Sequence, residues 1–242
     1  MRYTPFSAEL FKKNRAKLYA QLPPKSIVVV SSNDIMPTNA DGTMGFRQNS
    51  DLFYLSGLDQ EETFLILYPD APEAQWREIA FVRETSELIE IWEGHKYTKE
   101  EATQTSGIKN IQWSSNFESL LKTLVYSANH IYLTDNEHLR NASVVQTQNA
   151  RLGISIKNTY PNHAIGRLAP ILSDLRMQKE PEELQALQVA CDITNKGFRR
   201  VLNFTKPGVT EYEIEAEFIH EFTRNRSQGF AYTPIIASGA NA

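Results

Sequence analysis

The sequence predicts an α/β fold in which a mixed sheet is flanked by helices, followed by a second region that begins an α+β domain without completing it. Two observations support this prediction. Strand-like apolar runs alternate with helical patterns between residues 108 and 156, which is typical of βαβ crossovers. Residues 177–242 hold only two amphipathic helices and one strand-like run, which cannot close a core by themselves. We therefore expect one domain at residues 1–176 and an incomplete one at residues 177–242.

The composition excludes several classes of function. The chain has 242 residues and a net charge of −4, so nothing in its charge favours nucleic acid or an anionic membrane as a partner. Its apolar runs are too short to span a bilayer. The single cysteine, Cys191, argues against a disulfide framework, and no signal peptide follows Met1. We expect a cytoplasmic protein that binds neither nucleic acid nor membrane.

The first elements follow from apolar patterning. An apolar stripe predicts a helix over residues 7–22, which Pro23-Pro24 ends. The all-apolar run at residues 27–30 is typical of a strand covered on both faces. Two further runs, at residues 63–68 and 76–82, are joined by a proline-rich turn and predict an antiparallel pair of strands.

Between these elements lies the stretch from Arg47 to Gly57, which begins with polar residues and ends with an apolar run. The run Leu52-Phe53-Tyr54-Leu55, stopped by Gly57, predicts a buried strand. The polar residues would then hold the strand's entry. The long irregular segment at residues 31–45 precedes them, and segments of this kind inside a compact region are often functional.

The middle of the chain is predicted from capping signals and periodicity. Thr98 and Glu101 form a capping-box pattern, and Gly107 is a typical helix stop. Residues 87–94 give no clear pattern. The remaining elements expected here, in chain order, are a strand at 108–111, a helix at 117–125, a strand at 131–133, a helix at 141–150, a strand at 154–156 and a helix at 164–176.

Two long amphipathic helices are expected in the second region. Pro181 stands at the first position of one helix, and the pattern Thr210 to Glu213 caps the other. The apolar stripe of the first helix includes Cys191, which we interpret as a core residue rather than a nucleophile. Residues 230–237 are strand-like. Because the helices lack a complete sheet, we expect exposed apolar surface in this region.

Metal-binding and nucleophile motifs are weak. Glu217 and His220 are three residues apart on one helix, as in di-iron bundles, but no second pair of this kind is present. A dinuclear hydrolytic site needs about five or six converging carboxylate and imidazole ligands, and the sequence shows no such cluster. Glycine-rich phosphate-binding motifs and the G-x-S-x-G motif are also absent from the sequence.

Three stretches together resemble one family. The stretch Arg47–Gly57 is similar to the pattern R-Q-N-S-D-F-x-Y-L-T-G of the aminopeptidase P N-terminal motif. The stretch Leu175–Glu183 resembles the R-x-x-K-x-P-x-E segment that opens the catalytic domain. Lys206–Glu211 and residues 229–242 are similar to the stretch leading into the active site. In order and spacing, the chain resembles Xaa-Pro aminopeptidases of the creatinase/prolidase superfamily.

The resemblance implies a creatinase-like N-terminal domain, followed by the opening helices and first strand of a pita-bread metallopeptidase domain. Family members remove an N-terminal residue that precedes proline. They use a hydroxide that bridges two divalent metal ions, usually manganese, held by two Asp, one His and two Glu. In the family these ligands follow the segment that ends here at Ala242. We therefore expect a chain truncated before the ligands, with no bound metal and no activity of its own, and a homo-oligomer acting on peptides with proline second.

Three site residues are transferred from the family. Tyr232 matches a tyrosine that hydrogen-bonds near the metals, Trp92 an aromatic residue that lines the substrate cleft, and Asp41 an acidic loop residue that reaches a neighbouring subunit's active site. Their alternative interpretations are a strand tyrosine, a core tryptophan and a turn residue. The arginine that partners the acidic residue in the family has no clear counterpart, because Ile156 or Lys157 occupies its region.

Other functions remain open on the sequence. A prolidase, which is a dipeptidase, would share these motifs. A pita-bread protein that has lost its metal ligands would be a binding module, and a creatine-type amidinohydrolase would share the fold without metal. Ligands encoded after Ala242 would separate the enzyme from the binding module.

Overall fold

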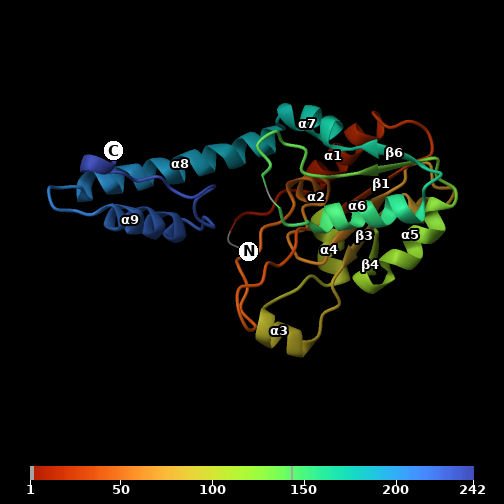
Figure 1. Cartoon of the computed structure of the whole chain (residues 1–242), viewed down its shortest axis with the longest axis horizontal. Coiled ribbons are helices and arrows are strands. Elements are labelled where there is room, and N and C mark those ends of the chain that lie inside the picture. The colour runs from red at the N-terminus through yellow and green to blue at the C-terminus, as the bar shows by residue number, and fades with distance from the viewer. Residues whose placement is uncertain (1–2, 143) are drawn as a thin grey trace. The chain divides into compact units, whose positions relative to one another are not determined.

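The computed structural model describes the chain except residues 1, 2 and 143, and it divides into two compact units (Figure 1). The larger unit is Phe6–Gln178, and the smaller unit includes Lys179–Ala242.

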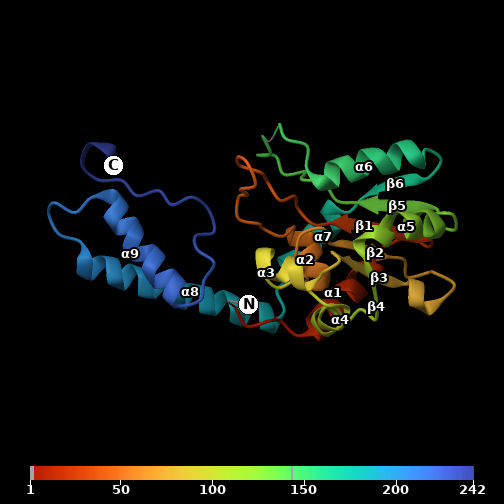
Figure 2. The ribbon, with the colours of Figure 1, turned by 90° about the horizontal axis from the view of Figure 1, so that it is seen from below.

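The larger unit is built on a six-stranded mixed sheet in the order β4-β3-β2-β1-β5-β6, which Figure 2 shows strand by strand. Strand β2 runs antiparallel to β1 and β3, while the other neighbours are parallel. The mixed sheet and the antiparallel pair of β2 and β3 are therefore confirmed. The strands are β1 (Ser26–Ser31), β2 (Phe64–Leu67), β3 (Glu78–Val82), β4 (Asn110–Trp113), β5 (His130–Leu133) and β6 (Ala164–Arg167).

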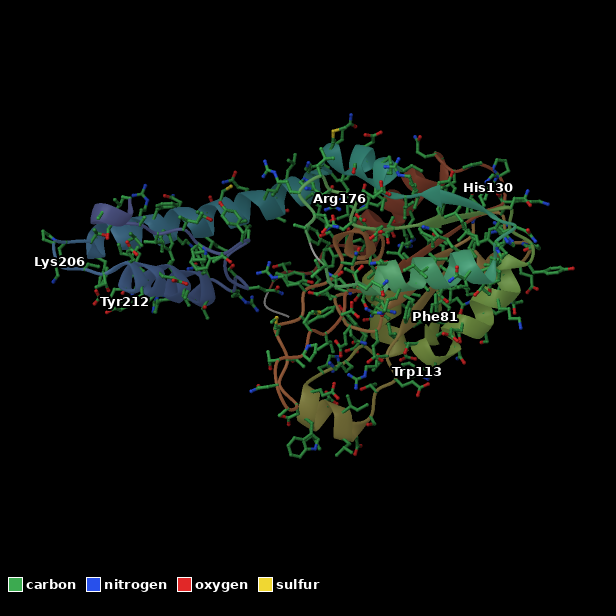
Figure 3. All side chains as sticks on the ribbon, viewed as in Figure 1. Phe81, Trp113, His130, Arg176, Lys206 and Tyr212 are labelled. Carbon is green, nitrogen blue, oxygen red and sulfur yellow. The ribbon has the colours of Figure 1, made fainter. Side chains whose placement is uncertain are left out.

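Helices cover both faces of this sheet because successive strand residues point to opposite sides. Val28 and Val30 belong to one core cluster, together with side chains of α1, α2, α4 and α7. Val29 and Phe81 belong to the other, with side chains of α5 and α6 (Figures 1 and 3). The helices of this unit are α1 (Ala8–Tyr19), α2 (Ser50–Ser56), α3 (Glu87–Glu93), α4 (Lys99–Ser106), α5 (Phe117–Val125), α6 (Gln148–Thr159) and α7 (Ala169–Met177).

The predicted strand at residues 52–55 is wrong, because this run lies in helix α2. The Asn49 side chain caps the helix by accepting hydrogen bonds from the backbone N–H groups of Asp51 and Leu52, at 2.9 and 3.1 Å. Gly57 ends it with a left-handed φ of 69°. A cap at each end therefore overrides the β propensity of the four apolar residues.

Two predictions in the middle of the chain are also wrong. Residues 141–150 and 154–156 were expected to be a helix and a strand, but one helix, α6, covers residues 148–159. Its N-terminus is set by Thr147, whose hydroxyl accepts a hydrogen bond of 3.2 Å from the Ala150 backbone N–H. Ile156 is buried on the core side of this helix, whereas Ile154 is exposed. A strand pattern was thus inferred from two isoleucines that point in different directions.

The helix expected at residues 164–176 begins with a strand instead. Residues 164–167 form β6, which adds to the sheet edge beside β5, and helix α7 starts at Ala169. Gly166 allows the close approach, because a Cβ there would lie 2.6 Å from the Tyr132 ring. Residues 164–167 form a strand because they pair with β5, and this long-range pairing is not visible in the local sequence pattern.

The smaller unit is a pair of helices, α8 (Pro181–Phe204) and α9 (Glu211–Arg224), which lie side by side (Figures 1 and 2). Both predicted helices are confirmed, and both begin with a capping box. Gly197 lets them approach, since a Cβ there would lie 2.9 Å from the Phe218 ring. Their contact also contains a cluster of aromatic rings: Phe198, Phe218, Phe222 and Phe230.

Residues 230–237 form no strand, although the sequence is strand-like. A strand needs a neighbour for its backbone groups, and the described part of this unit contains no other strand. The apolar stripe of α8 is similarly uncovered within the unit: Leu184 is 55% exposed and Leu202 is 75% exposed. The expected exposed apolar surface is therefore confirmed, whereas the prediction of Cys191 as a core residue is wrong, because it is exposed.

Candidate functional site

Asp41 lies at the tip of a hairpin-like loop in the larger unit. Pro37 and Thr43 form an isolated antiparallel bridge, and the Met44 N–H donates to the Met36 carbonyl at 2.8 Å. The chain turns between them, with Ala40 at a left-handed φ of 50°. Asp41 itself is exposed. The site prediction for Asp41 and its interpretation as a turn residue are therefore compatible, since the turn presents the carboxylate to solvent.

Trp92 lies in the last turn of α3, a helix with no buried residue. Its side chain is 80% exposed, so the alternative interpretation as a core tryptophan is wrong. Leu88 and Ile91 on the same helix are also exposed, at 65% and 75%. The helix thus presents an apolar surface to solvent, and no hydrogen bond or ring contact joins Trp92 to Asp41 among the described residues.

Charged side chains hold the C-terminal end of α3 to residues that flank strands β2 and β3. Arg83, directly after β3, forms a two-point contact with Glu93, with one N–H···O distance of 3.0 Å. Arg83 also donates to Glu61 at 3.2 Å, and Lys96 donates to the same Glu61 oxygen. The Glu61 and Lys96 side chains are only 8% and 11% exposed. The position of Trp92 therefore depends on a largely buried ion-pair network, here called the Glu61 network.

The pKa values in this network reflect the pairing. Burial alone would raise the pKa of the Glu61 carboxyl, but hydrogen bonds from Lys96 and Arg83 outweigh it and lower the pKa. The hydrogen bond from Arg83 lowers the pKa of Glu93 and, reciprocally, raises the pKa of Arg83. The lowered pKa values keep Glu61 and Glu93 as carboxylates beside Arg83, as an anchoring network rather than an acid–base pair requires.

The Glu61 network is absent from the sequence-based predictions, although the sequence carries one signal for it. The predicted antiparallel pairing of β2 with β3 places the residues before β2 beside those after β3, and the observed register pairs Phe64 with Phe81. Extending this register places Glu62 next to Arg83, and their charged atoms lie 3.7 Å apart. Residues 87–94 carry no clear pattern, and Glu93 attaches the end of α3 to this network through its charge.

Tyr232 lies in the smaller unit, in the irregular segment that follows α9. It is 79% exposed and belongs to no strand, so its alternative interpretation as a strand tyrosine is wrong. Its hydroxyl can still serve as a hydrogen-bond donor to a group that the described residues do not supply. Tyr232, Trp92 and Asp41 thus all present their side chains to solvent, and their roles stay predictions.

The polar part of the Arg47–Gly57 motif is structural. The Gln48 amide donates to the carbonyls of Leu58 and Gln60, at 3.0 and 2.8 Å, and Asn49 caps α2. Asp51 accepts a hydrogen bond of 2.7 Å from Arg176 at the end of α7. The sequence interpretation that these polar residues hold local structure is consistent with these bonds, although they stabilise a helix start and not a strand entry.

The residues present do not fit a metal centre. No group of three or more His, Cys, Asp or Glu side chains in the described part of the chain could hold a metal ion. Of the Glu217 and His220 pair considered from the sequence, Glu217 forms an ion pair with Arg200 of α8 across the helix contact. Arg200 also lies 3.8 Å from Glu221. These carboxylates stabilise the α8–α9 pair and are not available as ligands.

Family models and curated relatives show which known proteins this chain is similar to. The family model described as Aminopeptidase P, N-terminal domain, matches residues 11–132, and that of Metallopeptidase family M24 matches residues 185–242. A Xaa-Pro aminopeptidase from Haemophilus influenzae is 28% identical over 234 residues, which cover 97% of this chain and 52% of that protein. The chain thus spans about half the length of the curated relatives it matches.

Solved structures agree with this result. A structure described as an aminopeptidase P from Bacillus anthracis matches with a TM-score of 0.82 and 26% identity, over 90% of this chain and 52% of that one. Escherichia coli aminopeptidase P with the inhibitor Pro-Leu gives 0.74 and 25%, over 91% and 50%. These likenesses confirm the predicted fold class. Because the first family model covers half of the sequence, the chain belongs to the aminopeptidase P N-terminal domain family.

Proposed function

We propose that this chain is part of a metal-dependent Xaa-Pro aminopeptidase, which removes an N-terminal residue that precedes proline. The observation that carries the proposal is the match to relatives of that name along 97% of the chain, which includes both units. The M24 segment at residues 185–242 supports a metallopeptidase over a metal-free amidinohydrolase. The substrate is a peptide with proline at its second position.

The chemistry requires two divalent metal ions, and we propose manganese. Bound metal ions supply a hydroxide near neutral pH by lowering the pKa of coordinated water, and here that hydroxide would bridge both ions. The described residues provide no group able to hold these ions. The 242-residue chain by itself is therefore proposed to be inactive, with its larger unit shaping the cleft and binding substrate.

Three side chains have proposed roles. Trp92 covers an apolar side chain or the proline ring of the substrate, and its 80% exposure supports this availability. Asp41 reaches the site of a second copy in a homo-oligomer, where its carboxylate pairs with the substrate's amine. Tyr232 donates a hydrogen bond to a carboxylate that holds metal, and in this way orients the ligand. Both Asp41 and Tyr232 are exposed, as these roles require.

A peptide-release assay tests the proposal. Protein expressed with any coding sequence that follows Ala242 is given manganese and paired peptides that differ only in having proline or alanine second. We expect release from the proline peptide alone, lost on chelation and restored by metal. Cleavage of dipeptides only would indicate a prolidase instead. No cleavage, together with no metal bound, would favour a binding module and reject the enzyme.

We also propose a cytoplasmic location, on the basis of a single exposed thiol that a reducing compartment would preserve. Among the described residues, none of the helices has the length and apolar content that a membrane crossing requires. Fractionation of cells that express the tagged full-length protein would test the location.

A further inference from the structure

Helix α3 has no fully buried residue, and charged contacts tie its C-terminal end to the rest of the larger unit. Three of its apolar side chains, Leu88, Ile91 and Trp92, are exposed, and Ile89 is half-buried. At its C-terminal end, Glu93 is held by the Glu61 network. Because no apolar residue of α3 is fully buried, the strength of its attachment depends largely on the charges that hold it.

A second attachment is formed by His95, which follows the helix end at Gly94. The His95 Nδ1 atom lies 3.2 Å from Glu90 Oε1 on α3. On the other side of the ring, Nε2 lies 3.0 Å from both carboxylate oxygens of Glu101 on α4. One imidazole therefore bridges two helices through two carboxylates.

This arrangement suits only one protonation state of the ring. A carboxylate accepts hydrogen bonds, so both contacts need an N–H, and only the imidazolium carries two. In the neutral ring one nitrogen presents a lone pair to a carboxylate, and that contact is lost. The Glu101 side is anchored, because Glu101 also accepts a hydrogen bond of 2.9 Å from the Thr98 N–H in the capping box of α4.

Hydrogen bonding lowers the pKa of three carboxyl groups nearby, those of Glu61, Glu93 and Glu101. Glu93 is paired with Arg83, and Lys96 is paired with the largely buried Glu61. The groups that face His95 are Glu90 from α3 and Glu101 from α4. His95 is thus the group in this cluster whose charge changes in the physiological range.

We propose that His95 is a pH-sensitive clasp that docks α3 onto α4 when its imidazole is protonated and loosens α3, with Trp92, when it is neutral. The proposal stands on the two-sided geometry and is independent of the peptidase function. If that function is correct, the clasp sets how firmly the predicted substrate-binding tryptophan is held.

The direction of the effect follows from linkage. The hydrogen bond to Glu90, aided by the charge of Glu101, raises the pKa of His95. A group whose pKa is raised in the docked state stabilises that state fully below its ordinary pKa of about 6.5. This stabilisation is lost as the pH rises through the raised value. Because His95 and Glu90 are each 58% exposed, the effect is modest.

Amide hydrogen exchange of residues 87–93 measures the docking. Exchange is followed at about pH 6 and about pH 8.5, across the unperturbed histidine range, with rates corrected for intrinsic pH dependence. We expect protection to fall roughly two- to fivefold at the higher pH, the range of an exposed ion pair. Equal protection at both values would overturn the proposal.

Variants make the test specific. His95→Gln should show the low protection at both pH values, whereas His95→Arg, which stays charged, should show the high protection at both. His138→Asn, on an exposed loop outside the cluster, should behave like the unaltered protein. The fold is checked by the exchange of β1, which should not change in any variant. Retained pH dependence in His95→Gln would assign the effect to another group and reject the clasp.

Discussion

Arg176 Nη1 donates a hydrogen bond of 2.7 Å to Asp51 Oδ1, between residues 125 positions apart in the chain. The guanidinium also lies 6.0 Å from the centre of the Tyr54 ring. Figure 3 labels Arg176, which lies in the last turn of α7. Two stretches that resemble separate family motifs thus meet in the folded protein, and the start of α2 holds the end of α7.

A double-mutant cycle measures this pair. Asp51→Asn and Arg176→Gln should each destabilise the protein slightly, with a coupling energy of about 0.5 kcal/mol, because Arg176 is partly exposed. The measurement is urea unfolding of both single variants and the double variant. The more exposed pair of Arg167 with Glu137 serves as control and should show a smaller coupling. Equal coupling energies in the two pairs would contradict the expectation that the less exposed pair is coupled more strongly.

Removing Lys96 should destabilise the fold more than removing a surface lysine. Lys96→Met leaves the buried Glu61 carboxylate with Arg83 as its remaining partner, so we expect a loss of about 1–3 kcal/mol. Lys12→Met breaks an exposed pair with Glu9 and should change stability by less than about 0.5 kcal/mol. Unfolding in urea at neutral pH checks both values.

The same pair predicts how stability depends on pH. The pKa of Glu61 is lowered in the folded protein, so its contribution is fully present above the unfolded pKa of about 4.3 and is lost as the pH falls through the folded value. Acid unfolding of Glu61→Gln should therefore show a shallower loss of stability below about pH 4 than the unaltered protein. An unchanged acid profile would show that Glu61 is not linked to folding.

The caps of α2 predict two further losses of stability. Asn49→Ala should cost about 1 kcal/mol, because two backbone N–H groups lose their acceptor, whereas Asn49→Asp should retain the cap. Gly57→Ala should cost more, because φ is 69° and the new Cβ would lie 2.2 Å from the Phe11 ring. If thermal unfolding ranked these variants in the reverse order, the account of how α2 forms would be wrong.

Substitution of Trp92 distinguishes a role of this side chain in folding from a role in substrate binding. Since its side chain is 80% exposed, Trp92→Ala should change the free energy of unfolding by less than about 0.5 kcal/mol. In the proposed full-length aminopeptidase the same change should raise KM several-fold. The matched control is Leu88→Ala on the same helix, which should affect neither property. Unchanged KM in Trp92→Ala would remove Trp92 from the proposed site.

Apolar surface on α8 and α9 predicts weak protection in the smaller unit. The described part of this unit covers the two helices with no sheet, so their amides should exchange faster than those of β1 and β2. Hydrogen exchange on the isolated monomer gives the comparison. Full protection of residues 181–242 would contradict this expectation and would indicate a self-contained domain.

Sequence patterning predicted the parts of the fold whose signals are local. The capping boxes at Thr98 and Thr210 begin helices as expected, and the antiparallel pairing of β2 with β3 followed from two strand-like runs and a turn. It was wrong where a long-range contact decides the structure, and also where local helix caps compete with a β-prone run. Strand β6 depends on pairing with β5, and the local caps at Asn49 and Gly57 were overlooked beside a strongly β-prone run.

Less of the candidate site than of the fold could be predicted from the sequence. The exposure of Trp92 could not be predicted, because an apolar stretch such as residues 88–92 normally packs into a core. The network that anchors it joins residues on both sides of a hairpin, and such contacts are visible only after the register is known. The bridging position of His95 likewise depends on two helices whose relative placement no local pattern specifies.

The most direct measurement is peptidase activity of the purified 242-residue chain, with and without added manganese, on a peptide with proline second. Because the described residues contain no group that could hold the metal ions, we expect no metal-dependent release of the first residue and no bound manganese. Release that appears with manganese and disappears on chelation would place the catalytic ligands within this chain and contradict the account.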